Sequence, residues 1–239
     1  MTATPAEQPV SVGALLRGEA RTLQGWLERW ETKRVALCIV VILAGAGLYG
    51  AAMGWWRAPL QALFVGIKFP LVLLLTALGN ALINAMLAPL LGLNIGFRQS
   101  LLAVLMSFTI LAAILGSFSP ITAYVIWNSP PLSNNAVASE GTYRFIQLMH
   151  VGIIAFAGTT ANLRLMQLLR QLSGNVSVAR RVLFSWLGCN LFLGSQLFWI
   201  FRPFIGTPDL AIQFLRPDAF KGNFYETVLM ALKRLFELS

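Results

Sequence analysis

The sequence predicts an all-α polytopic membrane protein, a helical bundle with five transmembrane helices and an amphipathic helix near each end. Of its 239 residues, 57% are hydrophobic and only 11% are charged, whereas soluble chains average about 25% charged residues. The mean hydropathy of +0.70 exceeds what a soluble core of this length can bury, so lipid is the expected solvent for the excess. Five apolar runs, each close to the roughly 20 residues that cross a bilayer, supply the spans.

The chain divides into three parts: a cytoplasmic amphipathic N-terminal segment over residues 1–34, a five-span domain over residues 35–202 and an ordered tail over residues 203–239. Between Val12 and Trp30, apolar residues recur at helical spacing while polar residues occupy the other face. This periodicity predicts an amphipathic helix whose tryptophans suit the headgroup level. We favour a position on the membrane surface, with binding to a partner as the alternative.

The first two spans are expected to pack closely. Span one covers residues 35–54, and its Gly50 and Gly54 have the small-xxx-small spacing of a helix-packing surface. The amphipathic residues 60–68 predict an interfacial helix that turns at Pro70 into span two, because proline ends or kinks a helix.

Span two, which runs to Leu91, carries a polar stripe. Thr76, Asn80 and Asn84 follow one another at intervals of four residues and therefore share one helix face. Amide groups in lipid need hydrogen-bond partners, so this face is expected to point into the bundle. Structural packing is the favoured interpretation, and a path for a polar solute is the alternative.

The third span is flanked by turn-rich sequence. It is predicted from Leu101 to Trp127, with a kink expected at Pro120. Residues 128–142 are rich in turn-forming types and predict an exposed loop. A second loop is expected over residues 173–181, before the last span.

Span four covers residues 144–170 and is the most polar of the five, with the chain's only histidine, His150. A hydrogen bond from this histidine to an asparagine or serine of a neighbouring helix is the favoured interpretation. A pH sensor or gate is the alternative. Span five covers residues 182–201 and contains Asn190 and Gln196.

The tail after span five contains prolines and repeated aromatic residues, which predict an ordered, non-helical, packed segment. Asn223 then begins a final helix, with Glu226 three residues on as its capping-box partner. An apolar stripe along that helix predicts that it is interfacial.

The basic residues predict a cytoplasmic N-terminus and a C-terminus on the outside. With this orientation, ten basic residues face the cytoplasm and three face the other side before the tail, in accord with the positive-inside rule. The net charge of +9 is therefore assigned to anionic headgroups at the ends of the spans, and not to nucleic acid. The ten are Arg17, Arg21, Arg29, Lys33, Arg34, Arg98, Arg164, Arg170, Arg180 and Arg181, and the three are Arg57, Lys68 and Arg144.

The predicted spans lack the residues that several membrane chemistries need. No aspartate or glutamate falls within any of them, which disfavours proton-coupled transport and aspartyl proteolysis. One histidine and two scattered cysteines are too few for a metal site, and no cofactor motif is present. A hydrolytic dyad of His150 with Ser107 or Ser195 is a minor hypothesis, because no nucleophile elbow accompanies it. No catalytic, cofactor-binding or metal-binding residue is therefore assigned.

The tripeptide LYG at residues 48–50 and the tripeptide Lys68-Phe69-Pro70 resemble parts of the Yip-type membrane proteins. The predicted topology of amphipathic N-terminus, five spans and outside C-terminus is similar as well. The resemblance covers residues 35–201, and the acidic residue and proline of the fuller eukaryotic motif are missing. The block that starts at Phe201 resembles the tail of bacterial inner-membrane proteins of this type, which implies a bacterial inner membrane. The GTPase partners of the eukaryotic family do not carry over.

The lack of catalytic residues, the two interfacial helices and the ordered tail favour a non-enzymatic integral membrane protein that organises or anchors partner proteins. Besides the anionic bilayer, a protein partner or further copies of the chain are the expected partners. The alternative is an oligomeric channel or small-solute permease with a polar path from spans two, four and five. Its candidate lining is Thr76, Asn80, Asn84, His150, Asn190 and Gln196.

Overall fold

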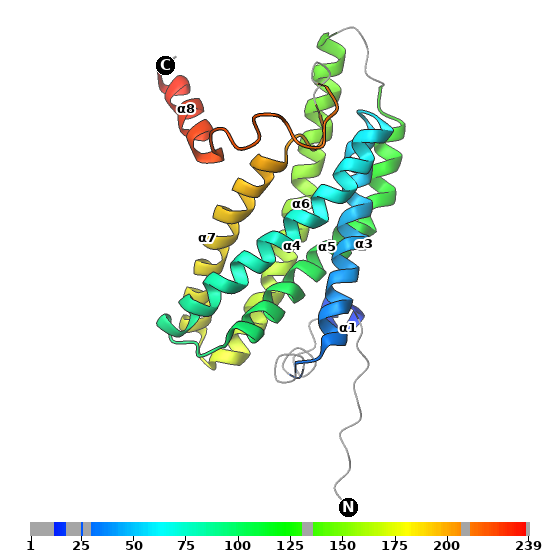
Figure 1. Ribbon diagram of the computed structural model, residues 1–239. Helices are drawn as coiled ribbons and strands as arrows, with labels where there is room; N and C mark the ends of the chain where they lie inside the picture. Colours follow the sequence, from blue (N-terminus) through cyan, green and yellow to red (C-terminus); the bar gives the residue numbers. More distant parts are fainter. Residues whose placement is uncertain (1–11, 18–24, 26–29, 131–135, 207–210, 238–239) are drawn as a thin grey trace, which may run out of the picture.

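The regular secondary structure is α-helical in the part of the chain that the computed structural model describes, residues 12–17, 25, 30–130, 136–206 and 211–237. Five of these helices, α3 to α7 in Figure 1, are long and apolar enough to cross a membrane. This confirms the predicted all-α bundle with five spans. The helices are α1 (Val12–Arg17), α3 (Thr32–Trp55), α4 (Pro59–Leu90), α5 (Phe97–Trp127), α6 (Ala136–Ser173), α7 (Val176–Phe201) and α8 (Phe224–Glu237).

Helices α3, α4 and α5 pack against one another and form the core, while α6 packs on α5 and α7 packs on α4 (Figure 1). The most apolar stretch is 50% buried in α4 and in α5, but only 22% buried in α6 and 6% in α7. A spanning helix satisfies its own backbone hydrogen bonds and can therefore face lipid with apolar side chains. The last two spans thus cover the core from one side and leave most of their own surface to the bilayer.

Glycines bring α3 into backbone contact with both of its neighbours. A methyl group on Gly50 would lie 2.6 Å from the carbonyl oxygen of Val65 in α4, and one on Gly54 would lie equally close to the α4 backbone. On the α5 side, a methyl group on Gly45 would overlap the carbonyl group of Ala112. Gly50 and Gly54 therefore lie in the α3–α4 interface, where small residues let two helices approach closely.

A single helix, α4, replaces the two helices expected around Pro70. The separate interfacial helix over residues 60–68 is a wrong prediction, because α4 continues through the proline. Proline removes one backbone donor, but within a membrane the neighbouring helices can compensate for that loss. Here the close contacts of Gly50 and Gly54 hold the segment before the proline against α3. Pro120 likewise lies inside a continuous helix, α5.

Helices α6 and α7 both begin earlier than hydropathy predicts. Residues 136–143 and most of residues 173–181 are helical and do not form the expected loops. Glu140 and Arg144 form an ion pair at 2.6 Å across one turn of α6, and the side chain of Asn175 caps the start of α7. A helix can continue into water on such polar contacts. The apolar run marks the part of a helix that lies in lipid, and the helix itself is longer.

The N-terminal segment meets the bundle at α5. The described part of the expected amphipathic helix is α1, and residues 18–24 and 26–29 of that prediction lie outside the described part. Leu15 is fully buried and belongs to the hydrophobic core, and α1 packs against α5. A helix that only rested on the membrane surface would not bury this side chain, so α1 is part of the bundle.

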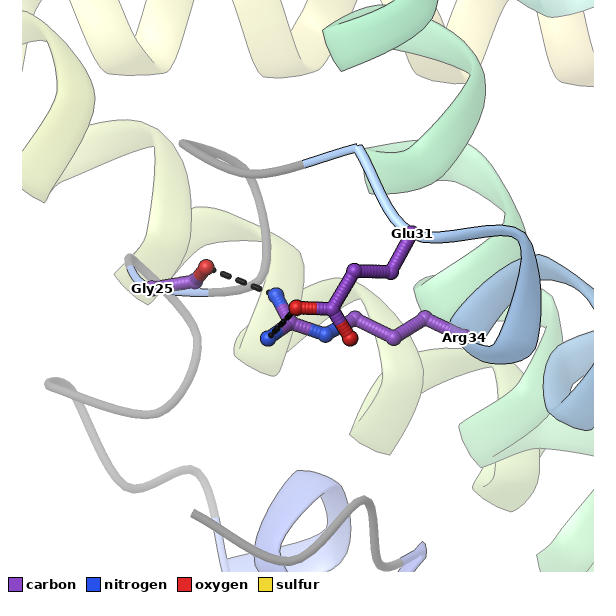
Figure 2. Close-up of polar contacts among 3 residues, drawn as sticks. All are labelled: Gly25, Glu31 and Arg34. Atoms are coloured by element: carbon purple, nitrogen blue, oxygen red, sulfur yellow. Dashed lines mark hydrogen bonds and ion pairs between the residues drawn. The ribbon is translucent and has the colours of Figure 1, made fainter. Parts of the chain in front are cut away.

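Arg34, near the start of α3, bonds two residues that precede it in the chain. Its guanidinium donates to the carbonyl oxygen of Gly25 at 2.7 Å and to the carboxylate of Glu31 at 2.8 Å (Figure 2). Hydrogen bonds between charged groups are stronger than neutral ones. Arg34 therefore ties Gly25 and Glu31 to the first turn of α3.

Helix α8, the last in the described part of the chain, begins where the capping residues predict. Glu226 N–H donates to Asn223 Oδ1 at 2.7 Å. The first turn of α8 is bound to α7, because Phe224 N–H donates to Gln196 Oε1 at 3.1 Å and the ring of Tyr225 stacks on an α7 phenylalanine. In Figure 1, α8 extends away from the bundle at the end opposite α1. We call this end, where α7 finishes, the tail end.

Candidate functional site

The tail folds back over the tail end of the bundle and is held there by two residues of α4. Lys68, which is fully buried, donates to the carbonyl oxygens of Pro203 at 3.2 Å and Gln213 at 3.3 Å. Gln61, also buried, donates to the carbonyl oxygen of Phe204 at 2.7 Å. A charged donor makes a strong hydrogen bond to a backbone carbonyl. Helix α4 thereby fixes the path of the tail.

The folded tail encloses a cavity with α3, α4, α6 and α7, which we call the tail cavity. Its volume is about 470 Å³, within the range of about 300–1,000 Å³ that is usual for small-ligand sites. None of the described residues that line it is acidic. The polar lining consists of Tyr143, Gln147, His150, Arg202 and Arg216, and the apolar lining includes Met53, Phe69, Val151, Ile154, Phe198, Phe204 and Ile205.

His150 is buried in the wall of the tail cavity and is bonded to α3. Its Nδ1 lies 2.8 Å from the hydroxyl oxygen of Tyr49, and the two rings meet edge to face. The partner is thus a tyrosine and not the expected asparagine or serine. When the hydroxyl donates to Nδ1, the neutral imidazole carries its proton on Nε2. Nε2 is buried without a hydrogen-bond partner among the described residues, so in that tautomer it is an unused donor.

Two arginines of the tail line the same cavity. Arg202 follows α7 directly, and its guanidinium lies over the ring of Trp199. Arg216 has Asp218 as an acidic neighbour at 4.0 Å. Burial, and next the charge of Arg216, lower the pKa of Arg202, while Asp218 opposes this shift. Arginine stays protonated at neutral pH all the same, so two like charges are held close together. In the described part of the chain, Nε of Arg202 and both Nε and Nη2 of Arg216 are buried without hydrogen-bond partners.

A second cavity, which we call the central cavity, lies further from the tail end, between α4, α5, α6 and α7. Its volume is about 390 Å³. It shares Phe69, Ile154 and Phe198 with the tail cavity. The rings of Phe69, Phe198 and Phe204, which we call the aromatic triad, have centroids 4.9 to 6.2 Å apart. Further lining residues are Leu73, Thr76, Ser107, Phe108, Leu111, Leu115, Ala161, Asn162, Leu187, Asn190, Leu191, Gly194 and Ser195.

Only some of the polar residues predicted to line a path come together. Thr76 and Asn190 line the central cavity, and His150 lines the tail cavity. Asn80 and Asn84 are fully buried and line neither of these cavities. Their amide groups have no hydrogen-bond partner among the described residues. The polar stripe of α4 is therefore split between a cavity wall and helix-packing positions.

Ser107 and Ser195, the serines of the hydrolase hypothesis, do not line the tail cavity that His150 lines. Ser195 Oγ donates to the carbonyl oxygen of Leu191 at 2.6 Å and lies 2.6 Å from the hydroxyl of Tyr225. Ser107 lines the central cavity, whereas His150 lines the tail cavity. Gln196 lines neither cavity and accepts its hydrogen bond from α8.

The contact between α3 and α6 gives a first testable prediction. Tyr49→Phe removes the hydroxyl and leaves Nδ1 of the buried His150 without its partner, which costs about 1–2 kcal/mol of unfolding free energy. Denaturant unfolding of the purified protein in a neutral detergent measures this loss. Tyr124→Phe is the matched control, because Tyr124 is 71% exposed and its loss should leave stability unchanged. Equal stability of the two variants would contradict a structural role for the pair.

The sequence patterns assign no site role to Arg202, Arg216 or Tyr49, although Tyr49 lies in the tripeptide at residues 48–50. The two arginines do share a sequence pattern that could have drawn attention to them. An apolar residue, arginine and proline occur in that order at residues 201–203 and again at residues 215–217. Tyr49 has no comparable signal, because its partner lies 101 positions away along the chain.

No match was found when the chain was compared with protein-family models, with curated proteins and with solved structures. The resemblance to Yip-type proteins therefore stays a prediction. A function is therefore inferred from the residues that line the two cavities.

Proposed function

We propose that this integral membrane protein is non-enzymatic and binds an amphiphile with an anionic head group in the tail cavity. The observation that carries the proposal is the pair Arg202 and Arg216 on a cavity whose remaining lining is mostly apolar. Nε of Arg202 and Nη2 of Arg216 are buried without hydrogen-bond partners among the described residues, and a buried unpaired donor costs free energy. A phosphate or carboxylate supplies the missing acceptors, and arginine binds both in a bidentate geometry.

The surroundings of the tail cavity add to this preference for an anion. Lys68 is a third cation at the tail end and is fully buried, and it holds the tail segment that carries Arg216. Nε2 of His150 is unpaired in the wall, and it is a further donor in the tautomer whose Nδ1 accepts from Tyr49. The acidic neighbour Asp218 is 54% exposed, so water screens its charge. Buried cations act more strongly than exposed ones, because the dielectric constant is lower inside the protein.

The predicted orientation places this site on the outer face of the membrane. The positive-inside rule puts the N-terminus in the cytoplasm, so the tail end lies outside in the proposed bacterial inner membrane. The site is then at the level of the outer-leaflet head groups. Helices α6 and α7, which are the least buried spans, leave a membrane amphiphile a lateral approach.

Two functions predicted from the sequence stay proposals beside this one. A polar channel draws less support, because Asn80 and Asn84 line neither cavity. Organising or anchoring partner proteins is compatible with amphiphile binding, and the little-buried surface of α7 supports it. Purification of the tagged protein from native membranes in a mild detergent tests the second function. A stoichiometric protein partner would support anchoring, and a homo-oligomer alone would count against it.

The proposed binding predicts that both arginines are needed. Arg202→Gln with Arg216→Gln is expected to weaken binding of hexadecyl phosphate at least tenfold. One charge-assisted hydrogen bond contributes about 1.5–3 kcal/mol, and about 1.4 kcal/mol corresponds to a factor of ten. Native mass spectrometry of the protein in a neutral maltoside detergent, with increasing ligand, measures the change.

The control for this experiment is Arg144→Gln, which removes an exposed arginine of α6 near the same end of the bundle. It should bind hexadecyl phosphate as the unchanged protein does. Unaltered binding by the double variant would overturn the proposal. Inorganic phosphate bound as tightly as hexadecyl phosphate would overturn the amphiphile and leave a site for a free anion. Hexadecanol bound as tightly would overturn the requirement for an anionic head.

A further inference from the structure

The central cavity adjoins the proposed head-group site at the aromatic triad. Phe69, Ile154 and Phe198 line both cavities, so no further layer of side chains separates the two. Along α7 the lining runs from Leu187 to Phe198, which is about 16 Å at 1.5 Å per residue. A ligand with its polar end between the arginines therefore has an elongated space beyond the triad.

The central cavity offers this ligand an apolar surface. The hydroxyl of Thr76 donates to the carbonyl oxygen of Val72 in its own helix, at 2.7 Å. The hydroxyl of Ser195 is likewise used by the backbone of α7. These two hydroxyl donors are therefore satisfied, and most of the remaining lining is apolar. Ser107, Asn162 and Asn190 are the other polar residues, and Asn190 has a buried unpaired Oδ1. Burial of hydrocarbon in such a site is favourable at about 25 cal/mol per Å².

The cavity is also reachable from the side of the bundle. Leu191 lines it, yet this side chain is 69% exposed. In a membrane, that exposed surface of α7 faces lipid. A hydrocarbon chain can thus enter between helices without first leaving the bilayer.

We infer that the central cavity holds the hydrocarbon chain of the amphiphile, a role that rests on the head-group binding proposed above. The ligand is then a long-chain amphiphile with an anionic head, bound across the aromatic triad. The arginines set the requirement for the head, and the depth of the central cavity sets the preferred chain length.

Filling the central cavity tests this role. Gly194 lies in α7, and a methyl group on it would meet only the side chain of Thr76, at 3.8 Å. Gly194→Leu therefore adds bulk to the cavity without a backbone clash. It is expected to weaken binding of hexadecyl phosphate at least tenfold and to change binding of butyl phosphate less than twofold. Competition between the two ligands in native mass spectrometry measures the shift in preference.

Two further variants keep the test decisive. Gly188→Leu is the matched control on the same helix, because a side chain there meets nothing within 4 Å and the residue does not line the cavity. It should bind both ligands as the unchanged protein does. Ser107→Leu fills the same cavity from α5, and it should reproduce the loss even if Gly194→Leu folds poorly.

The outcomes separate this inference from the proposed function. If the arginine variant loses binding but neither cavity-filling variant changes the chain-length preference, the head-group site stands and the chain site is overturned. If the arginine variant binds normally, the proposed function itself falls. A selective loss of the long-chain ligand in both Gly194→Leu and Ser107→Leu, with none in Gly188→Leu, supports the chain site.

Discussion

Gly45→Val is expected to leave little correctly folded protein in the membrane. The first carbon of the new side chain would overlap the carbonyl group of Ala112 in α5. Across the same contact, a methyl group on Gly116 would lie 2.8 Å from the Cα atom of Gly45. A backbone cannot give way as a side chain can, so α3 and α5 would have to separate. Overpacking costs about 1–3 kcal/mol in ordinary cores and more in some, and we expect at least the upper figure.

The measurement is the yield of monodisperse protein in a neutral detergent, followed by the midpoint of thermal unfolding. Gly152→Val is the control, because a side chain at Gly152 in α6 meets nothing within 4 Å. It adds the same β-branched residue to a spanning helix. Comparable yield and midpoint for the two variants would contradict the close α3–α5 packing.

Lys68→Met is expected to release the part of the tail around Gln213 from α4, while Gln61 still holds Phe204, and to weaken amphiphile binding. The carbonyl oxygen of Gln213 loses its donor, which costs about 1–3 kcal/mol when the group stays buried. The ring of Phe214 also loses the cation that lies 5.1 Å from its centroid. Arg216 follows within three residues, so its guanidinium is no longer fixed at the tail cavity. We expect at least a tenfold loss of hexadecyl phosphate binding.

Chymotrypsin provides a direct readout of tail release, since it cleaves after aromatic residues. Faster cleavage after Phe214 in the Lys68→Met variant is the expected result. Lys221→Met serves as the control, because Lys221 is an exposed lysine of the tail and its loss should leave cleavage unchanged. Equal cleavage rates in the two variants would show that Lys68 does not hold the tail.

The sequence was sufficient for the spans and insufficient for the ends of the helices. Apolar runs mark the residues that lie in lipid, because transfer of polar side chains into the bilayer is costly. The same runs do not mark where a helix stops. The pair Glu140 and Arg144 continues α6 beyond its apolar part, and Asn175 starts α7 before its own. At Pro70, the packing of α4 against α3 outweighed the local preference of proline for a break.

The candidate site was harder to predict, because contacts between distant residues create it. The sequence singled out His150 but not Tyr49, its partner on another helix. Arg202 and Arg216 come together because the tail, bonded to Lys68 and Gln61, turns back over the bundle. Neither the composition nor the periodicity of the sequence indicates that the tail turns back over the bundle. The polar stripe of α4 was visible, but only the structure separates Thr76, in a cavity wall, from the rest of the stripe.

The unequal burial of the five spans has a mechanical consequence. Helices α6 and α7 are joined by a tight turn at Gly174, whose φ of 59° suits glycine, and they are the least enclosed spans. Segments with few buried contacts cost the least free energy to displace. A hinge motion at that turn can therefore move α6 and α7 apart while α3, α4 and α5 stay in place. The distance between α6 and α7 can then differ between ligands of different width. Substitutions near Gly174 are expected to change this preference without destabilising the core of α3, α4 and α5.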